Sequence, residues 1–282
     1  MAIIKNPLTI VQTGGGTLPN YGSITYLDAN DVEQTLTLAT EDDYLELTIG
    51  ISSNVEIKVN GVTMTKADVT GVIIADGVQY IPNGFCSGCN NLTTATIPSS
   101  VHIIGENVFY YCKITTASFD LQNVHIIANA FLQNNSYFNS PISLPKVREI
   151  GSGFLMNCTS FNSSLTINDD CETIGGSFLR GCTAFVQPFS IPSGLSMSAD
   201  LTNPGGRFMN DCKNFVGPLV CNCPTTRLAT SGADGNNMLA TTDNTAAMYT
   251  TGVTLTGTYA NDWKTALPDR DTSPYRKLIV GS

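Results

Sequence analysis

Cysteine and histidine are the residues of this chain whose types and spacing could do chemistry. The 282-residue sequence has nine cysteines and two histidines. "CSGC" at Cys86 and Cys89 has the two-residue spacing of a redox pair or of half a zinc site. Cys221 and Cys223, in "CNC", lack that spacing. Whether any of these thiols is chemically active depends on the elements that position them.

The cysteines belong to a repeat with a period of about 23 residues, which is in the range of leucine-rich solenoids. One column of the repeat holds Cys89, Cys112, Asn135, Cys158, Cys182 and Cys212. An apolar residue stands four positions earlier in each copy: Phe85, Val108, Phe131, Phe154, Phe178 and Phe208. Leu or Phe follows three positions later in every copy except the second, "CKITTASF", which is irregular there.

These columns favour a structural role for the cysteines. A four-residue step is about one helical turn, so the Phe and Cys side chains are expected to face inward together. Cys and Asn can interchange because each fills a small buried slot and satisfies a local backbone group. We therefore predict that Cys89, Cys112, Cys158 and Cys182 are buried and unpaired. Cys86 occupies a column that is otherwise apolar, so a zinc or redox site at "CSGC" is disfavoured.

Two short strands are predicted in each repeat. "VHII", "VHII", "VREI" and "CETI" open successive copies, and "ATI", "ASF", "ISL", "LTI" and "FSI" alternate apolar and polar residues downstream. This alternation is typical of a strand with one buried face. When the strands are stacked, their polar positions form an outer ladder of hydroxyl groups at Thr96, Ser118, Ser143, Thr166 and Ser190.

This pattern resembles the BspA type of leucine-rich repeat, in which Val-x-x-Ile-Gly is followed by Phe, by Cys and by an apolar-x-Ile-Pro strand. The resemblance covers about residues 71–222. It implies a mainly β fold, a leucine-rich-repeat solenoid of about six rungs of about 23 residues each. It also implies a scaffold whose surface can be adapted to different partners.

The flanks lack the repeat and are predicted to form two further units. Residues 1–70 are expected to be a small β domain that covers one end of the solenoid, with strands in segments 23–40, 44–50 and 54–65 and a hairpin at "VNGV". Residues 223–282 are expected to be a C-terminal cap. It would contain a strand in "GVTLTGTY" and a short helix in "NDWKTALP", with Asn261 as N-cap and Pro268 as the stop.

Composition disfavours several function classes. The formal net charge is −9 and the sequence pI is about 4.5, so the chain has no basic stripe for nucleic acid. It has no run of about 20 apolar residues for membrane insertion. It also has no Ser-His-Asp arrangement, phosphate loop or HExxH motif. We therefore expect no catalytic residue, no cofactor and no bound metal.

The best candidate binding residues are those that the repeat places on its outer strand positions. They are Tyr80, His102, Ile103, His125, Ile126, Arg148, Glu149 and Glu172. If the column of Tyr80, Ile103 and Ile126 faces outward, it forms an apolar strip of the kind that contacts other proteins. The alternative is burial beneath the N-terminal domain. The two histidines could bind a metal or sense pH, but no third ligand is evident, and a solvated ladder is favoured.

Three functions compete: a phage virion protein, a bacterial cell-surface adhesin of the BspA type, and an enzyme. The N-terminal segment does not read as a secretory signal, which favours a virion protein assembled in the host cytoplasm. "MAIIKNPLTIV" and "WKTALPDRDTSPYRKLIV" also look similar to termini of phage structural proteins. The expected partners are other virion proteins and a host cell-surface protein or glycan. A homo-oligomer is also expected, with a trimer favoured, joined through residues 1–70 or 250–282.

Overall fold

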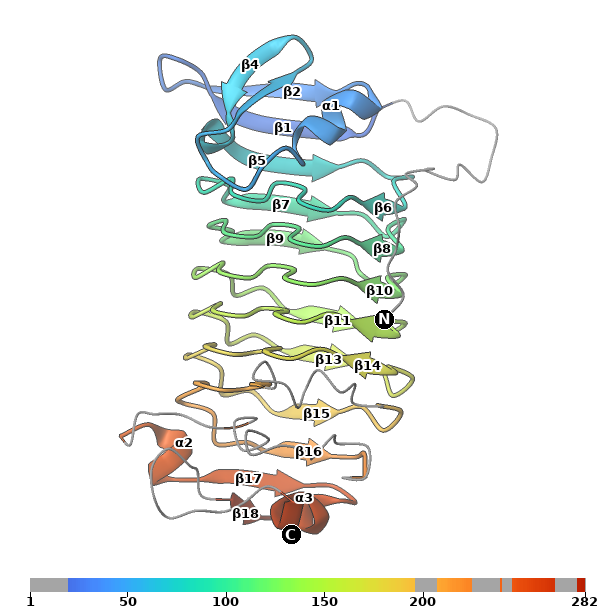
Figure 1. Cartoon of the computed structure of the whole chain (residues 1–282), viewed down its shortest axis with the longest axis vertical. Coiled ribbons are helices and arrows are strands. Elements are labelled where there is room, and N and C mark those ends of the chain that lie inside the picture. The colour runs from blue at the N-terminus through green and yellow to red at the C-terminus, as the bar shows by residue number, and fades with distance from the viewer. Residues whose placement is uncertain (1–19, 196–206, 225–238, 240–244, 267–277, 282) are drawn as a thin grey trace.

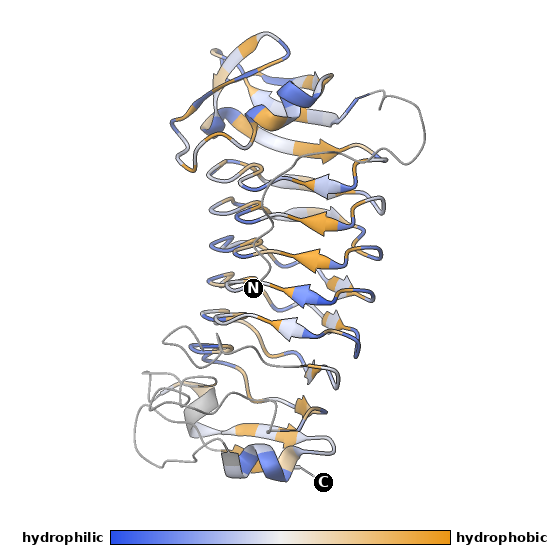
Figure 2. Cartoon of the chain, turned by 45° about the vertical axis from the view of Figure 1, so that its right-hand side comes forward, coloured by the Kyte–Doolittle hydropathy of each residue, from blue (hydrophilic) through white to orange (hydrophobic). Residues whose placement is uncertain are grey.

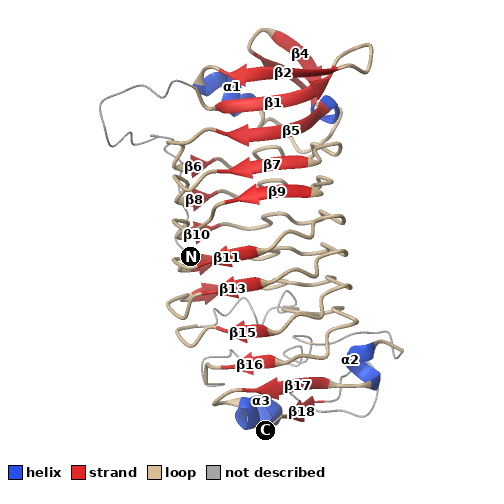
Figure 3. Ribbon diagram, turned by 180° about the vertical axis from the view of Figure 1, so that it is seen from behind, coloured by secondary structure: helices blue, strands red, loops and turns tan. Residues whose placement is uncertain are grey.

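The computed structural model describes residues 20–195, 207–224, 239, 245–266 and 278–281. These residues form an elongated, mainly β solenoid in which rungs stack along the long axis (Figure 1). The repeats from β6 to β15 each contribute one two-residue strand and one longer strand, with loops and turns making up the rest of the rung (Figure 3). The predicted fold class is confirmed.

The short strands form one parallel sheet along a side of the solenoid, here called the lateral sheet. Its strand order is β14-β12-β10-β8-β6. The strands are β6 (Tyr80–Ile81), β8 (Ile103–Ile104), β10 (Ile126–Ile127), β12 (Glu149–Ile150) and β14 (Thr173–Ile174). They coincide with the strands predicted to open each repeat.

The longer strands form a second, broader face. They are β5 (Val69–Ile74), β7 (Thr94–Ile97), β9 (Thr116–Phe119), β11 (Ile142–Leu144), β13 (Leu165–Ile167), β15 (Phe189–Ile191) and β16 (Leu219–Cys221). Along this face, Thr96 pairs with Ser118 and Ser143 pairs with Thr166. Thr166 Oγ1 also donates to Ser143 Oγ over 3.2 Å. The hydroxyl ladder is therefore present, although its strands belong to three separate sheets.

Turns, and not a helical turn, connect the two kinds of strand, so the predicted helical geometry of the Phe-to-Cys step is wrong. In the fourth copy, the Met156 N–H donates to Gly153 O over 3.1 Å and the Cys158 N–H donates to Leu155 O over 3.0 Å. Leu155 has φ 55° and Asn157 has φ 60°. Positive φ at the third residue is what a type II turn requires, so two successive turns bring Phe154 and Cys158 to the core.

Stacked phenylalanine rings fill the interior. One ladder contains Phe131, Phe154, Phe178 and Phe208, and another contains Phe138, Phe161, Phe185 and Phe215. The Phe154 and Phe178 ring centroids are 5.0 Å apart and the rings are nearly parallel. In the irregular second copy, Ile114 is the buried residue that follows Cys112. Ile114 stands two positions after the cysteine and not three, so this copy is one residue shorter at the corner, and the Ile114 N–H donates to Asn135 Oδ1 over 3.4 Å.

The N-terminal end adds antiparallel strands to the broad face. β1 (Gly22–Leu27) pairs with both β2 (Glu33–Leu38) and β5. The predicted hairpin is confirmed as β3 (Glu56–Val59) and β4 (Val62–Thr65). Its turn residues Asn60 and Gly61 both have positive φ, as a type I′ turn requires. A short 3₁₀-helix, Lys66–Asp68, leads into β5.

The strand predicted in segment 44–50 is wrong. The chain there begins with the helix α1 (Glu41–Glu46). Thr40 and Asp43 form a capping box, in which the Asp43 N–H donates to Thr40 Oγ1 and the Thr40 N–H donates to Asp43 Oδ2. This local cap, with three acidic residues in the first turn, outweighs the β propensity of the apolar residues that follow.

The C-terminal end continues the parallel stack. The strand predicted in "GVTLTGTY" is confirmed as β17 (Val253–Thr256), which lies between β16 and β18 (Leu278–Val280). The helix α2 (Ala247–Thr250) precedes β17. The division of the chain at residues 70 and 222 stays a prediction, although β1 and β5 share one sheet and so do β16 and β17.

The predicted C-terminal helix is present as α3 (Ala260–Ala266), but its start was predicted wrongly. Asn261 lies inside the helix and is not its N-cap. The Ala260 N–H donates to Gly257 O over 3.2 Å, so a preceding turn leads into the helix. Pro268 lies outside the described residues. Trp263 is fully buried, and its Nε1 donates to Cys223 O over 2.8 Å, which fixes α3 against the last rungs.

Candidate binding surface

The lateral sheet places the predicted binding residues in register. Tyr80, Ile103, Ile126, Glu149 and Thr173 are direct neighbours on successive strands. The residue that follows each of them is a fully or nearly fully buried isoleucine. Because side chains alternate along a strand, the five named residues point away from the core.

Three of these residues, Tyr80, Ile103 and Ile126, form what we call the lateral strip. Each of the three is half-buried, whereas Glu149 is exposed. Figure 2 shows the change along the sheet, from apolar strands at β8 and β10 to polar residues at β12. The described N-terminal elements lie at the end of the stack, beyond β5 and β6 (Figure 1), and not across the strip. Partner contact stays a prediction for these residues.

A polar column runs beside the strip, at the residue before each strand. An unbroken ladder of backbone hydrogen bonds joins the rungs at this column. The N–H groups of four residues each donate over 2.8 Å to the carbonyl of the equivalent residue in the preceding rung: His102, His125, Arg148 and Glu172. The His102 and His125 rings stack with centroids 5.6 Å apart and an interplanar angle of 17°. The ring stack therefore follows directly from the repeat.

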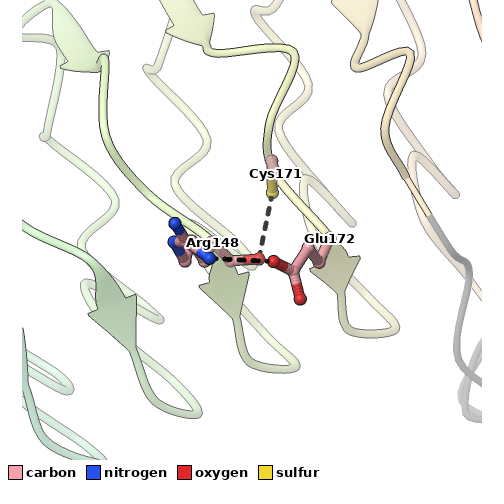
Figure 4. A network of polar contacts seen from close by, with 3 residues as sticks. All are labelled: Arg148, Cys171 and Glu172. Carbon is pink, nitrogen blue, oxygen red and sulfur yellow. Dashed lines mark hydrogen bonds and ion pairs between the residues drawn. The ribbon is translucent and has the colours of Figure 1, made fainter.

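Arg148 and Glu172 continue this column as an ion pair. Arg148 Nη1 lies 3.3 Å from Glu172 Oε1, and both side chains are more than half exposed. A pair this exposed contributes little to stability, so its effect is to define the charge pattern of the surface. Beneath it, the Cys171 thiol contacts the Arg148 carbonyl oxygen over 3.7 Å (Figure 4). Burial raises the pKa of Cys171 to about 12.

The thiols are placed for packing and not for reaction. All nine cysteines are buried and none is in a disulfide, which confirms the prediction for Cys89, Cys112, Cys158 and Cys182. Burial raises the pKa values of Cys86 and Cys112 well above the ordinary value, whereas a reactive thiol requires a lowered pKa and access to solvent. Within the described residues, no group of three His, Cys, Asp or Glu side chains could hold a metal ion.

Glycines let adjacent rungs approach at the ends of the lateral strands. A Cβ on Gly105 would lie 2.7 Å from Asn83 N, and one on Gly151 would lie 2.6 Å from the Ala128 carbonyl carbon. Asn83 Oδ1 accepts the Glu106 N–H over 2.8 Å at the same place. The close approach keeps the lateral sheet in register.

Sequence reasoning missed one set of exposed aromatic residues. Tyr111 and Tyr137 are each 57% exposed, at the corner where the chain turns toward β9 and β11. Neither residue repeats down its column, so the periodicity contained no signal for them. Among the described helices, none is long and apolar enough to cross a membrane.

A family model and a solved structure are similar to parts of this chain. Residues 61–186 match the family model described as the BspA type leucine rich repeat region, in six copies. This segment is therefore similar to the repeats of that family. The crystal structure of a leucine rich repeat protein from T. pallidum is similar at 20% sequence identity and a TM-score of 0.43, covering 61% of this chain and 80% of that chain. No curated protein matches the chain.

Proposed function

We propose that the chain is a non-catalytic binding scaffold whose lateral sheet contacts a protein partner. The observation that carries the proposal is the lateral strip: three in-register, outward-facing, large side chains beside a stacked histidine pair. Apolar strips rimmed by polar residues are typical of protein interaction sites. BspA-type repeats supply a rigid frame for such a surface.

The strip is matched to a partner with apolar side chains and hydrogen-bonding groups. Ile103 and Ile126 would supply apolar contact area, and the Tyr80 ring would add an aromatic contact. His102 and His125 can donate and accept hydrogen bonds at the rim. The exposed Arg148 and Glu172 would restrict the orientation of the partner, because charges at a rim affect association and register more than affinity.

We propose that the scaffold is part of a virion, as a head or tail fibre or a decoration-type protein. The support is the low content of charged residues and the similarity of the two termini to phage structural proteins. Both termini lie largely outside the described residues. A bacterial cell-surface adhesin is the second candidate, favoured by the BspA-type repeat itself. Two experiments separate the two locations. Mass spectrometry would detect the chain in purified virions if it is a virion protein, whereas protease treatment of intact bacterial cells would remove it if it is a surface adhesin.

The binding proposal is tested by paired substitutions. The first variant combines Ile103→Thr with Ile126→Thr. Threonine already occupies the same column at Thr173, so the fold should accept these substitutions. The matched control is Ser143→Ala with Thr166→Ala, on adjacent rungs of the broad face. Binding of the purified protein to intact host cells is expected to fall about tenfold for the first pair and to stay unchanged for the second. Equal binding by both pairs would exclude the lateral strip.

A further inference from the structure

Three tyrosines gather at the corner of the second and third repeats, and we call Tyr110, Tyr111 and Tyr137 the tyrosine corner. The Tyr111 N–H donates to Gln133 O over 2.9 Å, which places Tyr111 against Gln133 of the next rung. Tyr137 follows four residues later in that rung. The Tyr110 and Tyr111 ring centroids are 5.6 Å apart and the rings are inclined by 49°, so their faces are presented in different directions.

The exposure of these rings is unusual in this molecule. The phenylalanine ladders are buried, whereas Tyr111 and Tyr137 each keep 57% of their surface in solvent. Aromatic rings combine apolar faces with a polar hydroxyl group, which makes tyrosine common where binding proteins contact their ligands.

The surroundings of the corner are polar but almost uncharged. In segments 107–118 and 130–143 the single charged residue is Lys113, and amide and hydroxyl side chains are frequent. Asn157 Nδ2 donates to Asn134 Oδ1 over 2.8 Å beside Tyr111, so amide groups stand in a row next to the rings. A sugar is complementary to such a surface. Its C–H groups can stack on the tyrosine rings, and its hydroxyl groups can form hydrogen bonds with the amide side chains.

We propose that the tyrosine corner binds a neutral glycan. Sugar rings stack on the faces of Tyr111 and Tyr137, and the flanking amides donate to and accept from the sugar hydroxyls. Lys113 is the single charged residue of the two segments, and one lysine without an arginine or a second lysine is a weak site for a carboxylate or sulfate group, which favours a neutral glycan over a sialylated or sulfated one. This site is distinct from the lateral strip, because the broad-face strands start at the end of the rung opposite to the lateral sheet (Figure 1). The two sites are therefore tested by different variants.

A protein is the other ligand that this corner could accept. Ile51 is 65% exposed and its carbonyl oxygen lies against Gly88, where a Cβ would collide with it. The Gly88 N–H donates to Tyr110 O over 2.7 Å, so Ile51 borders the corner. A protein interface would use this side chain, whereas a glycan that stacks on Tyr111 and Tyr137 would not. Ile51→Ser therefore distinguishes the two classes.

The test uses the full chain on an array of neutral, sialylated and sulfated oligosaccharides, followed by calorimetry with the best-bound sugar. We expect a neutral oligosaccharide to bind, Tyr111→Ala and Tyr137→Ala each to weaken it about tenfold, and Tyr111→Phe and Ile51→Ser to bind like the wild type. Exposed substitutions of this kind rarely change folding, and circular dichroism verifies it. Ile103→Thr with Ile126→Thr, on the lateral strip, serves as the second control.

Three outcomes overturn the proposal. One is that no neutral oligosaccharide binds; another is that the alanine variants bind as well as the wild type. The third is that Ile51→Ser weakens binding of the sugar as much as Tyr111→Ala does, which would show that stacking on Tyr111 and Tyr137 is not what holds the sugar. If Ile103→Thr with Ile126→Thr loses binding to host cells but still binds the sugar, the lateral strip and the tyrosine corner are two separate binding sites.

Discussion

The thiol of Cys158 donates a hydrogen bond to the carbonyl oxygen of Leu132, one rung earlier, over 3.1 Å. Asn135 makes the equivalent contact through Nδ2 to the carbonyl oxygen of Phe109 over 2.6 Å. Leu132 and Phe109 both have positive φ, and their turns leave these carbonyls facing the core. The same contact recurs from Cys112 to Cys86, from Cys182 to Leu155 and from Cys212 to Leu179. Cys and Asn interchange because both supply a donor to this carbonyl.

The first prediction concerns this donor. Cys158→Asn should retain most of the stability of the wild type, because Asn135 shows that the column accepts an amide. Cys158→Ala should lower the free energy of unfolding by about 1 kcal/mol, since it leaves a buried carbonyl without its donor. Urea unfolding followed by the fluorescence of the buried Trp263 measures both. Equal losses for Ala and Asn would contradict the donor role.

The second prediction is a loss of stability in alkali. Burial raises the pKa values of Cys182 and Cys212 well above the ordinary value, and raises that of Cys221 to about 12. An unfolded thiol loses its proton near pH 8.5, so above that pH the unfolded chain binds fewer protons than the folded one. Stability is then complete below about pH 8.5 and falls as pH rises toward the folded-state pKa, by about 1.4 kcal/mol per pH unit for each such thiol.

This alkaline effect is measured as the urea midpoint between pH 7 and pH 11. Cys158→Asn provides the matched control, because it removes one titrating thiol while keeping the hydrogen bond. Its stability should fall less steeply with pH than that of the wild type. A midpoint that stays constant up to pH 11 would show that the thiols are not protected by burial.

The third prediction concerns the aromatic ladder. Phe154 is fully buried between Phe131, at a ring-centroid distance of 5.8 Å, and Phe178, at 5.0 Å. Phe154→Ala should lower the free energy of unfolding by about 3–5 kcal/mol, because it leaves a cavity and interrupts contact between rungs. Phe154→Leu keeps most of the volume and should cost less. Calorimetry that found Phe154→Ala no worse than Cys158→Ala would contradict this assignment.

The repeat could be predicted because each column appears several times. Ile104 and Phe154 each belong to a column in which the same type of residue recurs about every 23 positions. An apolar residue type that recurs in this way is predicted to be buried in every copy. The turn at Leu155 could not be predicted, since positive φ is favoured by Gly, Asn and Asp but has no marker at a leucine. The sequence predicts a strand that starts at Tyr44, whereas the capping box of Thr40 and Asp43 starts a helix before it.

The binding surface was predictable only where it follows the repeat. Tyr80 and Ile103 lie in a column, so their outward direction could be inferred from the period-two alternation. Tyr111 and Tyr137 lie at a corner where the copies differ, and the second copy is shortened there. Exposure at such a position depends on the path of the turn, which becomes visible only in three dimensions.

The last prediction concerns assembly: we expect a homo-oligomer, with a trimer favoured, joined through residues 1–70 or the 250–282 segment. A symmetric assembly would present several copies of a weak binding face at once and so raise avidity. In the N-terminal region, β2 ends the order of its sheet and is hydrogen-bonded only to β1 among the described strands. Val32, directly before it, is 51% exposed.

Light scattering on the full-length chain of 30.0 kDa measures the assembly. We expect Thr35→Lys with Thr37→Lys to reduce its mass, because lysine on an edge strand disfavours pairing with another chain. Thr166→Lys, on the broad face of the solenoid, is the control and should leave the mass unchanged. A monomeric wild-type chain would contradict self-assembly. Residues 1–70 would then be expected to attach the chain to a different protein. An oligomer that only Thr166→Lys disrupts would place the interface on the solenoid.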